Sequence, residues 1–374
     1  MRVVLAPNAF KGSFDAVQVA RAWADALAGR EEARALPMSD GGDGFLAVVR
    51  HHRPDVLEAA ARVPDPTGRG ITAGWGWDPD GGAAFVESAA AVGLRLSAPG
   101  SRDPLLVTSA GLGRLVRTVA GLAPREIVIG LGGSATVDGG LGMARELGFG
   151  FEDRDGRALG RPVDLARLAR IRPPGALAIP GAIRVLALVD VTAPLHGPAG
   201  AAREFASQKG ADAAAVERLA EGLERMSERW IADLGAPADL AARPGAGAAG
   251  GLGGALAAFL GARIASGSEW CGRLGGLAEA LAEADLVVTG EGRYDRQSAG
   301  GKATGHVLEL ARAAGVRSAV VCAEAGRDAD GAEPLVVDGA ALGRRPGETL
   351  SLDDLARLLE LALDRGRSGS RAGG

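Results

Sequence analysis

The feature that most constrains this chain is a glycine-rich turn between an apolar strand pattern and a helical pattern. Residues 127–131 are a continuous apolar run, which is typical of a buried parallel strand. Residues 132–140 contain four glycines that free the backbone, and residues 141–147 resume a helical pattern. A strand, a tight turn and a helix in this order predict an α/β fold built on a parallel sheet.

The same turn is a candidate cradle for an anion. The main-chain N–H groups of Gly132, Gly133 and Ser134 can point at a phosphate or carboxylate, and the following helix offers its positive end to that anion. Asp138 would repel the anion unless a proton or a metal ion intervenes. A phosphate site with magnesium would therefore accommodate both the anion and the Asp138 carboxylate. The alternatives are a tight turn with a hydroxyl cap and, for Asp138, a helix cap.

Length and composition indicate a soluble enzyme with small-molecule partners. At 374 residues the chain exceeds the usual size of a single core, so we expect two α/β domains. The net charge of -4 provides no basic face for nucleic acid. No apolar stretch approaches the ~18 residues of a membrane span, and the first strand is too short for a signal peptide. We therefore expect no membrane partner and a cytoplasmic location, with the oligomeric state open between monomer and homodimer.

Several common site chemistries have no support in the sequence. Cys271 and Cys322 form no CxxC pair, and the four histidines show no metal-ligand spacing. The chain contains no P-loop, no G-x-S-x-G elbow and no complete dinucleotide fingerprint. The 59 glycines also reflect a compositional bias, which weakens any argument from a single glycine.

Strand and helix patterns alternate through most of the chain, with one interruption. Residues 3–6 predict a strand and residues 13–27 a helix with one apolar face. Residues 61–87 place prolines and glycines between short strands, which predicts hairpins and a change of domain near residue 64. Residues 242–254 predict a glycine-rich joint that leads into a closely packed helix.

Four glycine-containing segments carry charged residues where strands are expected to end. They cover residues 8–13, 39–44, 132–140 and 290–295. Ligands of open α/β sheets collect at the carboxyl ends of the strands. We therefore expect a single crevice lined by carboxylates, backbone amides and a few cations.

The charged residues of these segments each allow a functional and a structural interpretation. Lys11 and Lys302 precede expected helices, where a positive charge is unfavourable unless an anion is bound, although a solvated loop lysine remains the alternative. Asp190 directly follows an apolar strand and suits either a general base for a substrate hydroxyl or a strand-end cap. Asp40 and Asp43 also suit turn and N-cap roles.

A third charged group follows the strand expected over residues 285–289. Glu291, Arg293 and Asp295 lie within five residues of one another. Such a group is as often a structural ion-pair network as a functional site, so both interpretations stay open.

Seven segments form an ordered set that spans about residues 1–315. They are APNAFKGS (6–13), PMSDGGDG (37–44), VESAAAVGL (86–94), GLGGSATVDGGLGM (130–143), QKG (208–210), PGAGAAGGLG (244–253) and TGEGRYDRQS (289–298) with GK (301–302). In this order the set resembles the bacterial type I glycerate kinases. Several ordered motifs are far more specific than one glycine loop.

The resemblance implies ATP- and magnesium-dependent phosphorylation of D-glycerate, with 2-phosphoglycerate as the usual product. It also implies two α/β domains with the active site in the cleft between them. One is a flavodoxin- or Rossmann-like parallel-sheet domain, which we assign to residues 1–64 and 264–374. The other is a smaller inserted α/β domain, which we assign to residues 65–263.

Phosphoryl transfer needs carboxylates for magnesium, cations and amides for the phosphates, and a group that orients the attacking hydroxyl. With the resemblance, this requirement assigns roles to the candidate residues. The expected catalytic residues are Asp190, Lys11, Arg293 and Asp295. The expected ATP-binding residues are Gly132, Gly133, Ser134 and Lys302. The expected substrate-binding residues are Asn8, Ser13, Asp40 and Glu291, and the expected magnesium ligands are Asp138 and Asp190.

Two positions depart from the family's common pattern. Ala193 stands where the family commonly has asparagine, and Asn8 stands where many relatives have aspartate. An altered amide can belong to the acid-binding site, so a related small hydroxy acid, or 3-phosphoglycerate as the product, stays open. A non-catalytic small-anion-binding protein on the same fold is the alternative from another class.

Overall fold

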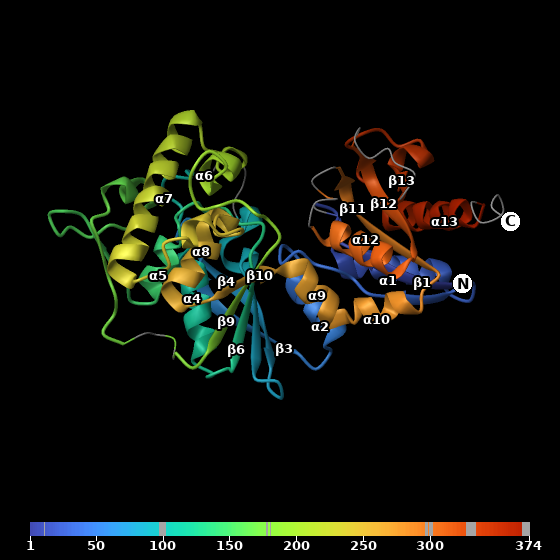
Figure 1. The fold of residues 1–374 in the computed structure, drawn as a ribbon, viewed down its shortest axis with the longest axis horizontal. Coiled ribbons are helices and arrows are strands. Elements are labelled where there is room, and N and C mark those ends of the chain that lie inside the picture. The colour runs from blue at the N-terminus through green and yellow to red at the C-terminus, as the bar shows by residue number, and fades with distance from the viewer. Residues whose placement is uncertain are drawn as a thin grey trace. The chain divides into compact units, whose positions relative to one another are not determined.

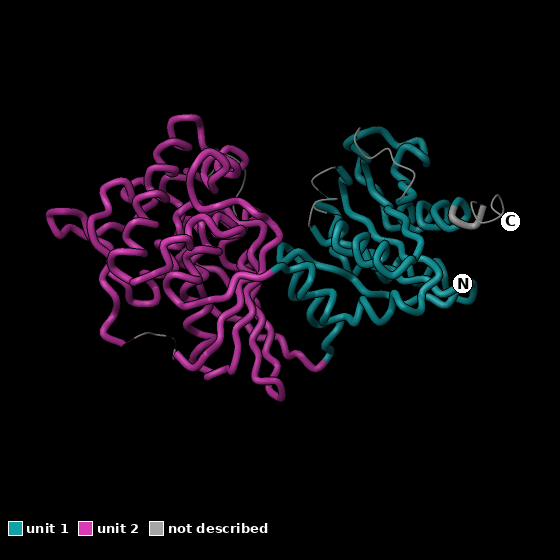
Figure 2. The backbone as a smooth tube through the Cα atoms, viewed as in Figure 1, with its two compact units in different colours: residues 1–54, 266–374 teal, residues 55–265 magenta. Residues whose placement is uncertain are grey.

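The structure is a computed structural model that separates into two compact units. It describes residues 1–10, 12–96, 102–176, 179, 181–295, 298, 302–326 and 334–368, with side chains to residue 365. Unit 1 consists of residues 1–54 and 266–374, and unit 2 of residues 55–265 (Figure 2). The chain thus leaves unit 1, completes unit 2 and returns, as expected for an inserted unit. The inserted unit is the longer of the two, although the sequence analysis expected a smaller one, because it contains the 22-residue helix α7 and a second small sheet.

Unit 1 is built on a five-stranded parallel sheet. The strands are β1 (Arg2–Pro7), β2 (Glu32–Ala35), β11 (Leu286–Tyr294), β12 (Arg317–Ala325) and β13 (Leu335–Asp338). They lie in the order β13-β12-β11-β1-β2, and all four neighbouring pairs are parallel. Numbered within the unit, this is the order 2-1-3-4-5 of flavodoxin-like folds, which confirms the predicted architecture.

Helices cover both faces of this sheet (Figure 1). They are α1 (Ala16–Leu27), α2 (Phe45–His52), α9 (Gly267–Gly275), α10 (Leu277–Ala282), α12 (Ala303–Ala314) and α13 (Leu352–Ser368), with the 3-10 turn η5 (Gly339–Leu342). Helices α1 and α13 share one apolar core with the sheet, and the buried Trp23 donates its Nε1–H to the carbonyl oxygen of Leu355 at 3.1 Å. On the other side, Leu308 of α12 packs with Val320 and Tyr294.

The start of α1 shows why the sequence folds this way locally. Asp15 accepts a hydrogen bond from the main-chain N–H of Gln18 at 2.8 Å, and the Gln18 side chain accepts from the N–H of Asp15 at 3.0 Å. This capping box satisfies two helix-end donors, and the helix begins at Ala16, three residues after the predicted start at Ser13. The chain between β1 and α1 is thereby left as a loop at the carboxyl end of the strand.

Unit 2 is built on a six-stranded mixed sheet. The strands lie in the order β10 (Arg263–Ser266), β9 (Arg184–Val189), β6 (Glu126–Gly130), β5 (Ala83–Glu87), β4 (Gly70–Asp78) and β3 (Leu57–Pro64). Strands β5, β6 and β9 are parallel, whereas β3, β4 and β5 form the antiparallel hairpins that the sequence predicted. The sequence predicted a change of domain near residue 64, which is the end of β3. Unit 2 instead begins at residue 55 and includes β3, because this strand pairs with β4 along its whole length.

The remaining elements of unit 2 pack around this sheet. The helices are α3 (Ala89–Val92), α4 (Ala110–Ala120), α5 (Leu141–Glu146), α6 (Ala201–Phe205), α7 (Ala213–Leu234) and α8 (Ala248–Leu260), and a small antiparallel sheet pairs β7 (Gly150–Glu152) with β8 (Arg170–Arg172). The 3-10 turns are η1 (Leu94–Leu96), η2 (Pro162–Arg167), η3 (Ser207–Lys209) and η4 (Leu240–Ala242). One core joins Leu115 of α4, Ile129 of β6 and Trp230 of α7. No helix in the described part of the chain has the length and apolarity to cross a membrane.

Candidate active site

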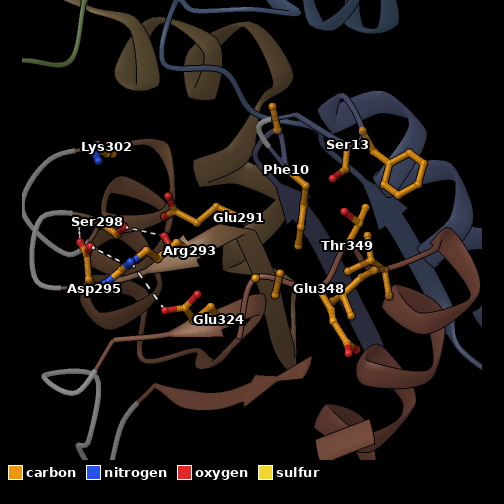
Figure 3. A pocket seen from close by; sticks show the side chains of 17 residues that line it. Phe10, Ser13, Glu291, Arg293, Asp295, Ser298, Lys302, Glu324, Glu348 and Thr349 are labelled. Atoms are coloured by element: carbon orange, nitrogen blue, oxygen red, sulfur yellow. Dashed lines mark hydrogen bonds and ion pairs between the residues drawn. The ribbon is translucent and has the colours of Figure 1, made fainter. Parts of the chain in front are cut away.

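Unit 1 contains a pocket at the carboxyl ends of β1, β11 and β12. Its volume is about 410 Å³, and its labelled side chains are shown in Figure 3. This is the place where the strand order of the sheet reverses, at which open α/β folds bind ligands. Five of the predicted site residues line the pocket together, namely Ser13, Glu291, Arg293, Asp295 and Lys302.

Arg293 is the central cation of this pocket. Strand β11 extends beyond the predicted end at Thr289 and places Arg293 opposite Glu324 of β12. The guanidinium lies 3.6 Å from Asp295 Oδ2 (through Nε) and 3.6 Å from Glu324 Oε1 (through Nη1), as Figure 3 shows. The Arg293 side chain is 63% exposed, and exposed ion pairs of this kind contribute little to stability. Arg293, Asp295 and Glu324 therefore do form ion pairs, as the structural interpretation of this group predicted. Because these pairs are long and exposed, they leave the guanidinium able to turn toward an anion.

Asp295 and Glu291 are held differently in the same pocket. The carbonyl oxygen of Asp295 accepts from the N–H of Ser298 at 3.0 Å. The Ser298 hydroxyl donates in turn to the carbonyl oxygen of Arg293 at 3.2 Å. Glu291 is buried, and its charge adds to the burial that raises the pKa of the Tyr294 hydroxyl. The pocket wall thus combines Ser298, which donates to two carbonyl oxygens of the chain, with the buried carboxyl group of Glu291.

Lys302 lies at the N-terminal end of α12. It occupies the N-cap position, and no side chain of the described residues caps this end of the helix. A lysine here adds positive charge to the positive end of the helix dipole, which is unfavourable without an anion. This agrees with the predicted position of Lys302 before a helix and leaves its anion-binding role a prediction.

Two predicted substrate residues lie near strand ends without lining the pocket. The N–H of Asn8 donates to the carbonyl oxygen of Gly290 at 2.8 Å, and its Oδ1 accepts from the N–H of Ala9 at 2.8 Å. Asp40 Oδ1 accepts from the N–H of Gly42 at 2.9 Å, which is the turn role named as its alternative. Their substrate-binding roles stay predictions, and Lys11 lies outside the described residues.

The glycine-rich turn of unit 2 presents open main-chain donors. In the part of the chain that the structure describes, the N–H groups of Gly132, Gly133 and Ser134 donate no hydrogen bond to the protein. Neighbouring groups are paired, since the carbonyl oxygen of Gly133 accepts from the N–H of Leu94 at 2.7 Å. Gly133 is exposed and has a positive φ of 62°, a conformation that side chains disfavour. The turn is therefore fixed while three successive donors stay available, as an anion cradle requires.

Asp138 closes the far end of this turn and is completely buried. Its Oδ2 accepts from the N–H and the hydroxyl of Ser109, both at 2.8 Å, and from the N–H of Gly142 at 3.0 Å. Its Oδ1 accepts from the N–H of Gly140 at 3.0 Å. Burial raises the pKa of Asp138, and these four donors oppose that shift. The carboxylate thereby joins the starts of α4 and α5, which corresponds to the cap alternative.

A magnesium ion at Asp138 would have to displace protein donors, so this role stays a prediction that the contacts do not favour. Among the described residues, no group of three or more histidines, cysteines or acidic residues is arranged to hold a metal. Asp190, the other predicted ligand, is half-buried and directly follows β9. Its position at a strand end is the one the sequence predicted.

A second glycine-rich segment supports the turn from behind. At the start of α8, residues Ala249, Gly250 and Gly251 all have positive φ, from 54° to 95°. A Cβ atom on Gly250 would lie 2.0 Å from the carbonyl oxygen of Thr136, and the N–H of Gly139 donates to the carbonyl oxygen of Gly250 at 3.1 Å. The predicted glycine-rich joint therefore also serves as the packing surface of the cradle.

Lys209 is a residue to which the sequence analysis gave no role. It ends η3 and is only 5% exposed. Its Nζ donates to Ser134 Oγ at 3.0 Å and to the carbonyl oxygen of Thr136 at 2.8 Å. Burial lowers the pKa of Lys209 to about 7, and the charge of Asp138 opposes the shift. The signal that could have found it is its rarity, since the chain contains only three lysines.

Comparison with known proteins gives consistent results along the chain. A model of the Glycerate kinase family matches residues 3–351. The chain is 38% identical over 327 residues to "Glycerate 2-kinase" of Escherichia coli strain K12, which covers 83% of this chain and 82% of that protein. It is 37% identical over 310 residues to "Glycerate kinase" of Neisseria meningitidis serogroup B, which covers 81% and 80%. A crystal structure described as a "putative glycerate kinase 2" from Salmonella typhimurium LT2 covers 100% of this chain and 99% of that chain, with 32% identity and a TM-score of 0.79.

Proposed function

The chain belongs to the glycerate kinase family, and from this premise we propose that it transfers the γ-phosphoryl group of ATP to a hydroxyl of D-glycerate. The observation that carries the proposal is the set of three open N–H donors at Gly132, Gly133 and Ser134. Open main-chain donors at a strand end are suited to phosphate oxygens, whose charge is spread over several acceptors. Use of ATP also favours a cytoplasmic enzyme.

The pocket of unit 1 supplies the groups for a small acid. Arg293 is exposed and held only by two ion pairs of 3.6 Å, so its guanidinium can exchange a carboxylate of the protein for that of the substrate. Ser13 lines the same pocket and offers a hydroxyl for the hydroxyl groups of the substrate. Lys302 adds a second cation at the start of α12. We propose that these residues bind and orient glycerate.

Magnesium fits one carboxylate of unit 2 better than the other. Mg²⁺ keeps several waters and uses one or two carboxylates, and a half-buried carboxylate such as Asp190 leaves room for those waters. Asp138 is completely buried, and both of its oxygens accept from protein donors. When bound, the ion neutralises charge on the phosphate oxygens. If Asp190 holds the ion, Asp190→Asn raises the Mg²⁺ concentration needed for half-maximal activity. If Asp190 accepts the hydroxyl proton instead, the substitution lowers kcat and leaves that concentration unchanged.

We propose 2-phosphoglycerate as the product, in line with the name of the Escherichia coli relative. The test is a coupled assay of ADP release with ATP, Mg²⁺ and D-glycerate, with the phosphate position resolved by phosphorus NMR. ADP release without 3-phosphoglycerate supports the proposal. If the product is 3-phosphoglycerate, the proposed position of the phosphate is wrong. If the protein binds ATP but releases no ADP with D-glycerate, D-glycerate is not the substrate. If no hydroxy acid leads to ADP release, the protein is not a kinase of this class.

A matched pair of arginine variants tests the substrate pocket. Arg293→Ala removes a positive charge that is expected to bind the carboxylate of glycerate or the negative charge that develops during phosphoryl transfer. The kcat/KM for glycerate should therefore fall by about 10²-fold. Arg30→Ala is the control, because Arg30 is also an exposed unit 1 arginine with an ion pair, to Glu360 at 2.6 Å. Equal activity of the two variants would exclude Arg293 from the site.

A related hydroxy acid is the second candidate substrate. It is favoured by Ala193, which has a methyl group where the family commonly has an amide and whose carbonyl oxygen accepts from the N–H of Gly247 at 3.0 Å. A panel of two- to four-carbon hydroxy acids in the same assay separates the candidates. A higher kcat/KM for another acid, together with recovery of glycerate preference in Ala193→Asn, would establish this alternative.

A further inference from the structure

The scarcity of lysine makes each lysine of this chain informative. Of 42 Lys and Arg residues, only Lys11, Lys209 and Lys302 are lysines. At an exposed position arginine supplies the same charge, so a chain this rich in arginine has little need of lysine on its surface. A compact ammonium with three donors is needed where a planar guanidinium does not fit. Lys209 is buried, whereas Lys302 was already expected to bind an anion.

Lys209 contacts the cradle directly. Its Nζ donates to the hydroxyl of Ser134, whose own N–H is one of the three open donors, and to the carbonyl oxygen of Thr136. Both acceptors are buried, so the two bonds fix the buried end of the turn, next to the exposed Gly133. Behind the turn, Gly250 leaves room for the Thr136 carbonyl group that Lys209 binds.

The charge of Lys209 lacks a close counter-ion in the protein. Within the described residues its ammonium has no carboxylate oxygen within 4.0 Å, and Asp138 acts on it only at longer range. A buried cation is costly unless an opposite charge compensates it. A buried ammonium with no described carboxylate oxygen within 4.0 Å, next to three N–H donors that have no described protein partner, therefore points to an anion that completes the group.

We propose that Lys209 is a positioning residue of the phosphate site: it fixes the turn through Ser134 and Thr136 and supplies the positive charge that a phosphate of the nucleotide neutralises. This rests on the proposed kinase function for the identity of the anion. The placement of the charge beneath the cradle rests on the contacts of Lys209 alone.

The test compares Lys209→Met, which keeps the length of the side chain without the charge, with Lys209→Arg. ADP binding is measured by calorimetry, and KM for ATP, KM for glycerate and kcat are measured separately. We expect Lys209→Met to weaken ADP binding and to raise KM for ATP by about 10- to 100-fold, with KM for glycerate within about 2-fold, a range typical of the loss of charge-assisted bonds. Lys209→Arg keeps the charge, but a guanidinium is larger and flatter than the ammonium that is buried here. We therefore expect this variant to recover less than half of the loss in log Kd for ADP.

Each outcome decides the proposal. Unchanged ADP affinity in a folded Lys209→Met protein would overturn it, as would a change in KM for glycerate alone. If the parent binds ADP but does not phosphorylate glycerate, and Lys209→Met loses ADP affinity, the proposed substrate fails while this inference stands.

A milder variant covers the case in which Lys209→Met does not fold. Ser134→Ala removes one of the two acceptors of Lys209 and keeps the ammonium. It should weaken ADP binding by a smaller factor, about 3- to 10-fold, because the ammonium and its bond to the Thr136 carbonyl oxygen remain. ADP binding equal to that of the parent would overturn the proposal.

Discussion

Asp138→Asn separates the structural from the metal-binding interpretation of the buried carboxylate. The substitution keeps the shape of the side chain but replaces one acceptor oxygen by an NH₂ group, which then faces an N–H donor. If the amide oxygen takes the place of Oδ2, three bonds become neutral and the bond from Gly140 is lost. A hydrogen bond to a charged group contributes about 1.5–3 kcal/mol against about 0.5–1.5 for a neutral one, so the four changes sum to about 4–8 kcal/mol. The neutral amide also avoids part of the burial cost of the carboxylate, so we expect a net loss of about 3–5 kcal/mol in the free energy of unfolding.

Thermal and urea unfolding of the variant measure this loss. For a unit of this size, about 2–4 °C of melting temperature corresponds to 1 kcal/mol, so the melting temperature should fall by about 6–20 °C. Asp153→Asn is the matched control, because Asp153 Oδ1 also accepts two main-chain N–H groups, from Asp155 and Arg157 at 2.9 Å, but at an exposed site. The reasoning is refuted if Asp138→Asn costs less than about 1 kcal/mol while the Mg²⁺ requirement of the kinase rises, since the carboxylate would then serve the metal rather than the fold.

Two further predictions concern stability in each unit. Gly250→Ala should lower the free energy of unfolding by about 3 kcal/mol, because the new Cβ would lie 2.0 Å from a carbonyl oxygen. Gly261 also has a positive φ, but a Cβ there would meet nothing within 4 Å, so Gly261→Ala should lower it by only about 1 kcal/mol. Equal losses for the two variants in urea unfolding would contradict the packing argument. The main-chain N–H of Ser351 and the guanidinium of Arg344 lower the pKa of Asp354 from 3.8 to about 2, so its stabilisation is present above pH 3.8 and is lost as the pH falls through about 2. Asp354→Asn should therefore reduce the dependence of unfolding free energy on pH in this range, and an unchanged slope would exclude the contribution.

Much of the fold could be predicted because its signals are local. The strand at residues 3–6, the helix up to Leu27 and the hairpins around residue 64 follow from hydrophobic period and turn residues within a few positions. The end of β11 could not be predicted in this way. Glycines at 290 and 292 indicate a loop, yet the strand continues to Tyr294 because β12 pairs with it along this stretch. Pairing with a distant strand overrides local propensity.

The candidate site was predicted in part for the same reason. The pocket residues of β11 share one short segment, so their proximity was visible in the sequence. The partners of the cradle were not visible, because Ser109 precedes Asp138 by 29 residues and Lys209 follows Ser134 by 75. Asp138 itself suggested a metal, because two of its four donors belong to Ser109 and cannot be read from residues 130–143.

The compositional bias of this chain acts on glycine and lysine in opposite ways. With 59 glycines, a glycine-rich segment is weak evidence until the packing around it distinguishes positions with no room for a side chain, such as Gly250, from positions with ample room, such as Gly261. With three lysines among 42 basic residues, a lysine is strong evidence for a specific role even from the sequence alone. Lys209, which the sequence analysis left without a role, is therefore a residue to which the composition already pointed. Its contact with Ser134 brings a rare lysine and a glycine-rich segment together at one turn.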